Sequence, residues 1–177
     1  MNLKLAPILI IIFAVIMRLL PHPPNMAPIT AMALFGGAYL PKKYALTLPI
    51  IALLISDYFI GFYGLTMFFV YASFLLVGGI GIWLKKHPHP SYILSAALLS
   101  SFLFFLVTNF GVWLTTSMYT KDIPGLVNSY TMAIPFYRNT IIGDLIFTTI
   151  IFVIYNITKQ VAQRFLPANY FIKVYEA

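Results

Sequence analysis

The stretch "RLLPHPPNMAPITAMALFGG", residues 18–37, decides how the early part of the chain can fold. It places one arginine at the end of a long apolar run. Three prolines with a histidine and an asparagine follow, and then a short segment rich in alanine and glycine. Because proline lacks the backbone N–H and fixes φ, the cluster at residues 21–24 ends the first helix. The small residues after it predict a slim second helix that neighbouring helices can approach closely.

The composition is that of an integral membrane protein. The chain has 177 residues, of which 61% are hydrophobic and only 8% are charged, whereas soluble domains carry about 25% charged residues. A membrane-spanning helix needs about 20 apolar residues, so the long apolar blocks predict an all-α polytopic protein with a single integral membrane domain over residues 1–177. Cysteine is absent, which excludes disulfides and thiolate metal sites.

Six membrane-crossing segments and one short helix are expected. The N-terminal apolar run is interpreted as a retained first helix, because no small-residue cleavage site of a signal peptide follows it. A short re-entrant or interfacial helix ending at Pro135 is expected just before the last crossing. The expected fold class is therefore a six-transmembrane-helix bundle with a short extra helix before the last span. The predicted crossings are residues 3–20, 27–40, 44–62, 65–84, 92–115 and 139–160.

The basic residues predict how the chain is oriented in the membrane. If the chain crosses the membrane six times, three basic residues (Arg18, Lys121 and Arg138) fall on one side and eight basic residues fall on the other. Because lysine and arginine accumulate in cytoplasmic loops, we expect both termini in the cytoplasm and a multi-pass protein of the bacterial inner membrane. We interpret the positive charge as topogenic and expect no nucleic-acid partner. The eight are Lys4, Lys42, Lys43, Lys85, Lys86, Lys159, Arg164 and Lys173.

The unusual polar residues gather in the expected outer half of the bundle. Charged groups there are costly against lipid, so they should face inward and pair, or line a wet cavity. Two arginines can balance the two aspartates, although the sequence leaves their pairing open. Thr140, Asp144 and Thr148 recur every four residues and therefore form one stripe on a helix. The predicted substrate-binding residues are Arg18, His22, Asn25, Asp57, Asn109, Trp113, Arg138, Asn139 and Asp144.

Five of these residues also have an alternative interpretation. Arg18 and Arg138 can extend to lipid headgroups from helix ends. Asp144 can complement the dipole at the start of the last predicted helix, and Asn109 can join two helices by a hydrogen bond. His22 can be a loop residue without a role.

No motif points to catalysis. The chain has no HExxH, P-loop, GxGxxG or nucleophile-elbow sequence, so we expect no enzymatic activity, cofactor or metal.

Four long blocks of the sequence carry a resemblance to a known family. They are "RLLPHPPNMAPITAMALFGGAYL" (18–40), "LLISDYFIGFYG" (53–64), "SSFLFFLVTNFGVWL" (100–114) and "YTMAIPFYRNTIIGDLIF" (130–147). These blocks resemble the DUF6580 family of small bacterial membrane proteins of unknown function. That family is in turn similar to the substrate-binding S components of energy-coupling factor (ECF) vitamin transporters.

The similarity to S components implies a function in uptake. It implies a six-helix bundle that holds a vitamin-sized molecule near the outer face, under a gate formed by residues 21–25. A transmembrane coupling subunit and ATPases would supply the energy. Two other classes stay open: a structural or assembly protein without a ligand, and an ion-coupled secondary carrier that acts alone.

Overall fold

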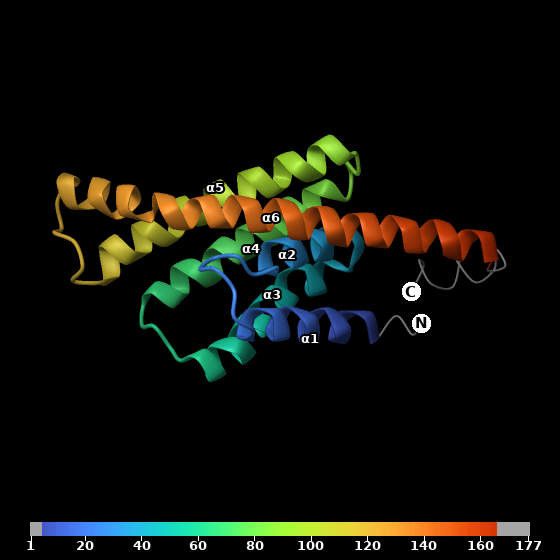
Figure 1. The fold of residues 1–177 in the computed structure, drawn as a ribbon, viewed down its shortest axis with the longest axis horizontal. Coiled ribbons are helices and arrows are strands. Elements are labelled where there is room, and N and C mark those ends of the chain that lie inside the picture. Colours follow the sequence, from blue (N-terminus) through green and yellow to red (C-terminus); the bar gives the residue numbers. More distant parts are fainter. Residues whose placement is uncertain (1–4, 166–177) are drawn as a thin grey trace.

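The computed structural model describes residues 5–165 of the chain, and this part is all-α, as predicted (Figure 1). Lys4 and Lys173 of the predicted cytoplasmic set lie outside it. The described elements are α1 (Leu5–Leu19), α2 (Ile29–Tyr39), α3 (Lys42–Ile60), α4 (Thr66–Leu84), α5 (Pro90–Thr115) and α6 (Ile123–Phe165).

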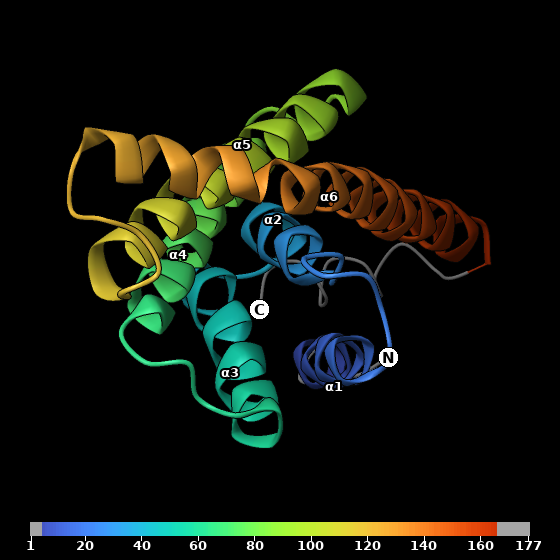
Figure 2. The same ribbon diagram turned by 60° about the vertical axis from the view of Figure 1, so that its left-hand side comes forward.

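Helix α2 forms the centre of the fold (Figure 2). It has 11 residues, and all but Tyr39 are buried. It contacts each of the five other helices. A helix that is hydrophobic all round, without a polar face, is suited to such a buried position. The segment after the proline cluster is therefore the core around which the other helices pack.

Glycine allows a close backbone contact between α2 and α4. A Cβ atom added to Gly37 would lie 2.4 Å from the carbonyl carbon of Gly81. A Cβ atom added to Gly81 would lie 2.7 Å from the carbonyl oxygen of Leu34. No side chain fits at either position, which confirms that the small residues permit close approach of neighbouring helices.

Two apolar clusters surround α2. One joins it to α4, α5 and α6, and there Phe35 packs edge-on against Phe152 with ring centroids 5.6 Å apart. The other joins it to α1, α3 and α4 through Ala14, Met32, Leu53 and Phe74. Because both clusters use α2, the core is continuous through this helix.

The prediction of a separate short helix before the last crossing is wrong, because α6 runs unbroken for 43 residues with Pro135 inside it. A proline removes one helical hydrogen bond, and membrane helices tolerate this where neighbouring elements support the backbone. Helix α5 supplies that support on both sides of Pro135. The Tyr130 hydroxyl donates to the Leu106 carbonyl at 2.9 Å, and the Tyr137 ring stacks on Phe105 with centroids 4.5 Å apart.

Among residues 5–165, three helices are long and apolar enough to cross a membrane, where six crossings were predicted. They are Thr66–Leu84, Pro90–Thr115 and Ile123–Val161 within α6. Helices α1 and α2 have only 15 and 11 residues, and the apolar part of α3, Tyr44–Ile60, is also short. The full α6 is about 64 Å long at about 1.5 Å per residue, which exceeds the roughly 30 Å of a bilayer core.

Successive helices run back and forth between two ends of the molecule (Figure 1). The loops after α1, α3 and α5 lie at one end. The loops after α2 and α4 lie at the other, together with the end of α6. The second end carries Lys42, Lys85, Lys86 and Arg164. Successive loops therefore alternate between the two ends, which is the arrangement on which the predicted charge distribution depends.

Candidate functional site

All six helices line one cavity of about 470 Å³. The loop between α1 and α2 and the loop between α3 and α4 also contribute to its wall. The lining is largely apolar, with a few polar and charged side chains. The lining residues are Arg18, His22, Asn25, Ala27, Ile29, Thr30, Leu53, Ile60, Tyr63, Val70, Phe74, Phe104, Thr140 and Asp144.

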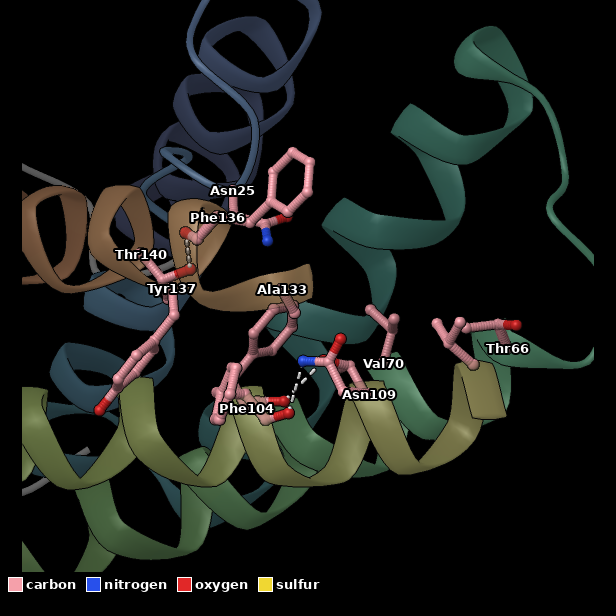
Figure 3. Close-up of a pocket in the computed structure, with 12 residues that line it drawn as sticks. Asn25, Thr66, Val70, Phe104, Asn109, Ala133, Phe136, Tyr137 and Thr140 are labelled. Atoms are coloured by element: carbon pink, nitrogen blue, oxygen red, sulfur yellow. Dashed lines mark hydrogen bonds between the residues drawn. The ribbon is translucent and has the colours of Figure 1, made fainter. Parts of the chain in front are cut away.

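A smaller cavity of about 180 Å³ adjoins it between α4, α5 and α6 (Figure 3). The two cavities share Asn25, Val70, Phe104 and Thr140 in their walls. Asn109 lines the smaller one, and its amide donates to the Phe105 carbonyl of its own helix at 2.8 Å. The two cavities therefore form neighbouring compartments on one side of α5.

The loop at residues 20–28 forms the exposed side of the larger cavity. His22 and Asn25 are exposed and line the cavity. Asn25 has a φ of 62°, a left-handed conformation that asparagine adopts more readily than most residues. The Asn139 amide on α6 donates to the Pro24 carbonyl at 3.3 Å, so one side chain tethers this loop to the last helix.

Arg18 is held in a polar network beside the cavity. Its Nη2 lies 2.7 Å from Oδ1 of Asp57, and its Nη1 donates to the Ser56 hydroxyl at 2.6 Å. Tyr71 donates to Oδ2 of Asp57 at 2.7 Å, and Tyr63 approaches the same atom at 3.5 Å. Burial, followed by the nearby Asp57, raises the pKa of Tyr63, so this loop hydroxyl stays protonated and can donate. The pairing left open by the sequence is therefore Arg18 with Asp57.

Asp144 lines the same cavity from α6. It is 2% exposed, and the Ser101 hydroxyl of α5 donates to its Oδ2 at 2.6 Å. Thr140 and Thr148 are buried as well, which confirms that the polar stripe on α6 faces inward. Since α6 begins at Ile123, the alternative that Asp144 complements a helix N-terminus is wrong.

One family model matches this chain. It describes a family of unknown function, DUF6580, and it covers residues 2–167. The chain belongs to the DUF6580 family. No curated protein and no solved structure matched it significantly. The family resemblance drawn from the four sequence blocks is thus confirmed, and the similarity to S components stays a prediction.

The structure divides the predicted site residues of this DUF6580 protein into several groups. Asp57 lies behind Arg18 and lines neither cavity, and Asn139 acts on the loop. Trp113 and Arg138 also line neither cavity. The residues that do line a cavity are Arg18, His22, Asn25, Asn109 and Asp144.

Trp113 instead closes the loop between α5 and α6. Its indole N–H donates to the Thr120 carbonyl at 2.9 Å, and the Lys121 ammonium donates to the Trp113 carbonyl. The side chain of Asp122 accepts from the Thr120 hydroxyl and from the Gly125 N–H, and these bonds lower the pKa of Asp122. This end of α6 is therefore capped by its own loop, away from the cavities.

Sequence reasoning missed several hydroxyl groups of the site. Thr30 lines the larger cavity, Ser101 binds Asp144, and Ser56 and Tyr71 complete the Arg18–Asp57 network. The available signal was that Ser56, Ser101 and Thr30 interrupt otherwise apolar helices. Ser56 and Ser101 find their partners, Arg18 and Asp144, on other helices, so the sequence alone did not show which charged side chain each one contacts.

The hydrogen bond from Asn139 to Pro24 is expected to limit access to the larger cavity. Removing one hydrogen bond worth about 1 kcal/mol shifts an opening equilibrium about fivefold. Because the native chain lacks cysteine, a single Thr30→Cys reporter on the cavity wall can be labelled with a soluble maleimide. We expect Asn139→Ala to raise its labelling rate about fivefold.

The matched control is Asn156→Ala, at an exposed position of the same helix. This substitution should leave the labelling rate at Thr30→Cys unchanged. Equal rates in Asn139→Ala and in the reporter alone would show that the contact with Pro24 does not hold the loop over the cavity.

Proposed function

We propose that this protein is the substrate-binding membrane component of a small-molecule uptake transporter. The observation that carries the proposal is the cavity of about 470 Å³ that all six helices line beneath a proline-rich loop. Small-molecule sites have volumes of about 300–1,000 Å³ and combine apolar walls with a few placed polar groups. Asp144, Asn25 and Thr30 supply such groups on an otherwise largely apolar wall.

In this proposal the substrate enters past residues 20–28 from the outer face of the bacterial inner membrane. Both termini are cytoplasmic, which is supported by the basic residues at the opposite end of the described helices. The chain carries no nucleotide-binding motif. Energy for transport would come from a transmembrane coupling subunit and ATPases, as the similarity to S components implies.

The first test is whether a small molecule occupies the cavity. We expect native mass spectrometry of protein from its own host, in mild detergent, to show a bound small molecule. Ala27→Phe places a ring in the larger cavity and should abolish the bound mass. Ala72→Phe, on an exposed face of α4 that lines neither cavity, should retain it.

A bound mass that survives Ala27→Phe would place the ligand elsewhere. A wild-type protein without any bound molecule, together with no flux in proteoliposomes containing the coupling subunit and ATPases, would contradict the proposal.

The second candidate is a structural or assembly function without a ligand. The Arg18–Asp57–Ser56 network favours it, because Asp57 is completely buried and its oxygens are engaged by Arg18 and Tyr71. Such a network can define helix register without binding anything. Under this candidate, Ala27→Phe would fill empty space and raise the unfolding temperature.

A further inference from the structure

We propose that the ligand of the larger cavity is an organic cation with an apolar body, whose ammonium or amidinium group pairs with Asp144. This inference rests on the proposed function and specifies its substrate class. The sequence alone, with two arginines against two aspartates, left the charge of the substrate open.

Arg18 is already neutralised by the protein. Its two terminal nitrogens are engaged by Asp57 at 2.7 Å and by Ser56 at 2.6 Å. An anionic ligand would have to compete with a carboxylate that is held in place by Tyr71 and completely buried. Leaving that carboxylate without its partner is strongly unfavourable. Arg18 is therefore a poor site for a substrate carboxylate or phosphate.

Arg138 is the second arginine among the predicted substrate-binding residues. It is exposed and lines neither cavity. Histidine is the remaining basic type in the cavity wall, and His22 lies at its exposed side with Nδ1 2.6 Å from the Leu20 carbonyl oxygen. The inner part of the cavity thus contains no free cationic group from the described residues.

Asp144 is a buried carboxylate that has no ionic partner within the described part of the chain. No basic side chain among the described residues pairs with it, and its neighbour Ser101 is neutral. A buried carboxylate without a counter-charge is costly. A cation delivered into the cavity offsets this cost, so the site gains most from a positively charged ligand.

The oxygen atoms around Asp144 also suit a donor. Thr140 lines the cavity one helical turn from Asp144, and its hydroxyl donates its proton to the Phe136 carbonyl at 3.0 Å, which leaves its oxygen able only to accept. An ammonium group has three N–H donors and no acceptor, and it can satisfy a carboxylate and a hydroxyl oxygen together. The apolar body would lie against Phe74 and Phe104, whose ring centroids are 5.2 Å apart.

Three indole compounds test the sign of the charge. Tryptamine is a cation, tryptophol is neutral and indole-3-acetate is an anion, while all three carry the same ring. We expect wild-type protein to bind tryptamine at least about tenfold more tightly than tryptophol, and to bind indole-3-acetate most weakly, by calorimetry in detergent at pH 7.5. Any endogenous molecule found by native mass spectrometry should carry an amine or amidine.

Asp144→Asn keeps the shape of the side chain and an acceptor for Ser101 while removing the charge. It should reduce tryptamine binding to the level of tryptophol and leave tryptophol binding unchanged. Asp122→Asn makes the same change at the exposed loop before α6 and should preserve the preference for tryptamine. If Asp144→Asn does not fold, the ranking of the three compounds on wild-type protein decides the question.

The two proposals fail in different ways. Equal or tighter binding of tryptophol or indole-3-acetate, lost in Ala27→Phe, would overturn the cation assignment and leave the binding function standing. An endogenous ligand that is anionic would do the same. No binding of any compound and no endogenous ligand would overturn the proposed function, and the cation assignment with it.

Discussion

Asp57→Ala is expected to lower the free energy of unfolding by about 3–5 kcal/mol, because it leaves a buried charge without its partner. Arg18 is only 16% exposed and Asp57 is fully buried. Tyr71 also loses the acceptor that it contacts at 2.7 Å. The unfolding temperature of the purified protein in detergent, followed by scanning fluorimetry, measures the effect. We expect a decrease on the order of 10 °C, since about 1 kcal/mol corresponds to 2–4 °C in chains of this size.

The double substitution Arg18→Leu with Asp57→Leu is the informative control. Replacing a whole buried ion pair by apolar residues of similar volume is often neutral or stabilising. The double variant should therefore be more stable than Asp57→Ala by several kcal/mol. A loss below about 1 kcal/mol in Asp57→Ala, the size of ordinary polar contacts between membrane helices, would contradict the importance of this network.

Gly81→Ala is expected to disrupt the contact between α2 and α4. The new methyl group would lie 2.7 Å from the Leu34 carbonyl oxygen and 2.8 Å from that of Ala33, both backbone atoms that cannot rotate away. Overpacking of this kind costs about 1–3 kcal/mol and sometimes more. Because α2 contacts each of the five other helices, its displacement affects the whole core. We expect a lower unfolding temperature and a smaller yield of monodisperse protein.

Gly79→Ala on the same helix is the matched control. A Cβ atom there meets nothing within 4 Å, and alanine is favoured over glycine in a helix by about 0.5–1 kcal/mol. Gly79→Ala should therefore be neutral or stabilising. If both alanine variants have the same stability, the helices are not in contact at Gly81.

The sequence predicted five of the six helices to within a few residues. The exception was α6, where Pro135 suggested a break. Proline removes a hydrogen bond locally, but the contacts of Tyr130 and Tyr137 with α5 support the helix through that point. Those contacts depend on how α5 and α6 align, and no local pattern within residues 126–137 records that alignment.

The candidate site was predicted in part. Arg18 and Asp144 line the larger cavity, because charged groups in apolar helices turn inward. His22 and Asn25 line it from the loop between α1 and α2. Trp113 and Arg138 do not line it. Both belong to the same predicted layer as the others, and depth in a membrane does not specify which face of a helix points to the cavity.

By itself, the sequence determined that the chain is an all-α bundle with apolar helices and that residues 21–24 separate α1 from α2. Composition and proline stereochemistry act locally, so they are readable without a structure. Only the tertiary structure decided that Arg18 pairs with Asp57 and that Asp144 lines the cavity with no ionic partner among the residues that the structure describes. These outcomes depend on distances between residues on different helices, which are set by how closely α2 and α4 pack at Gly37 and Gly81.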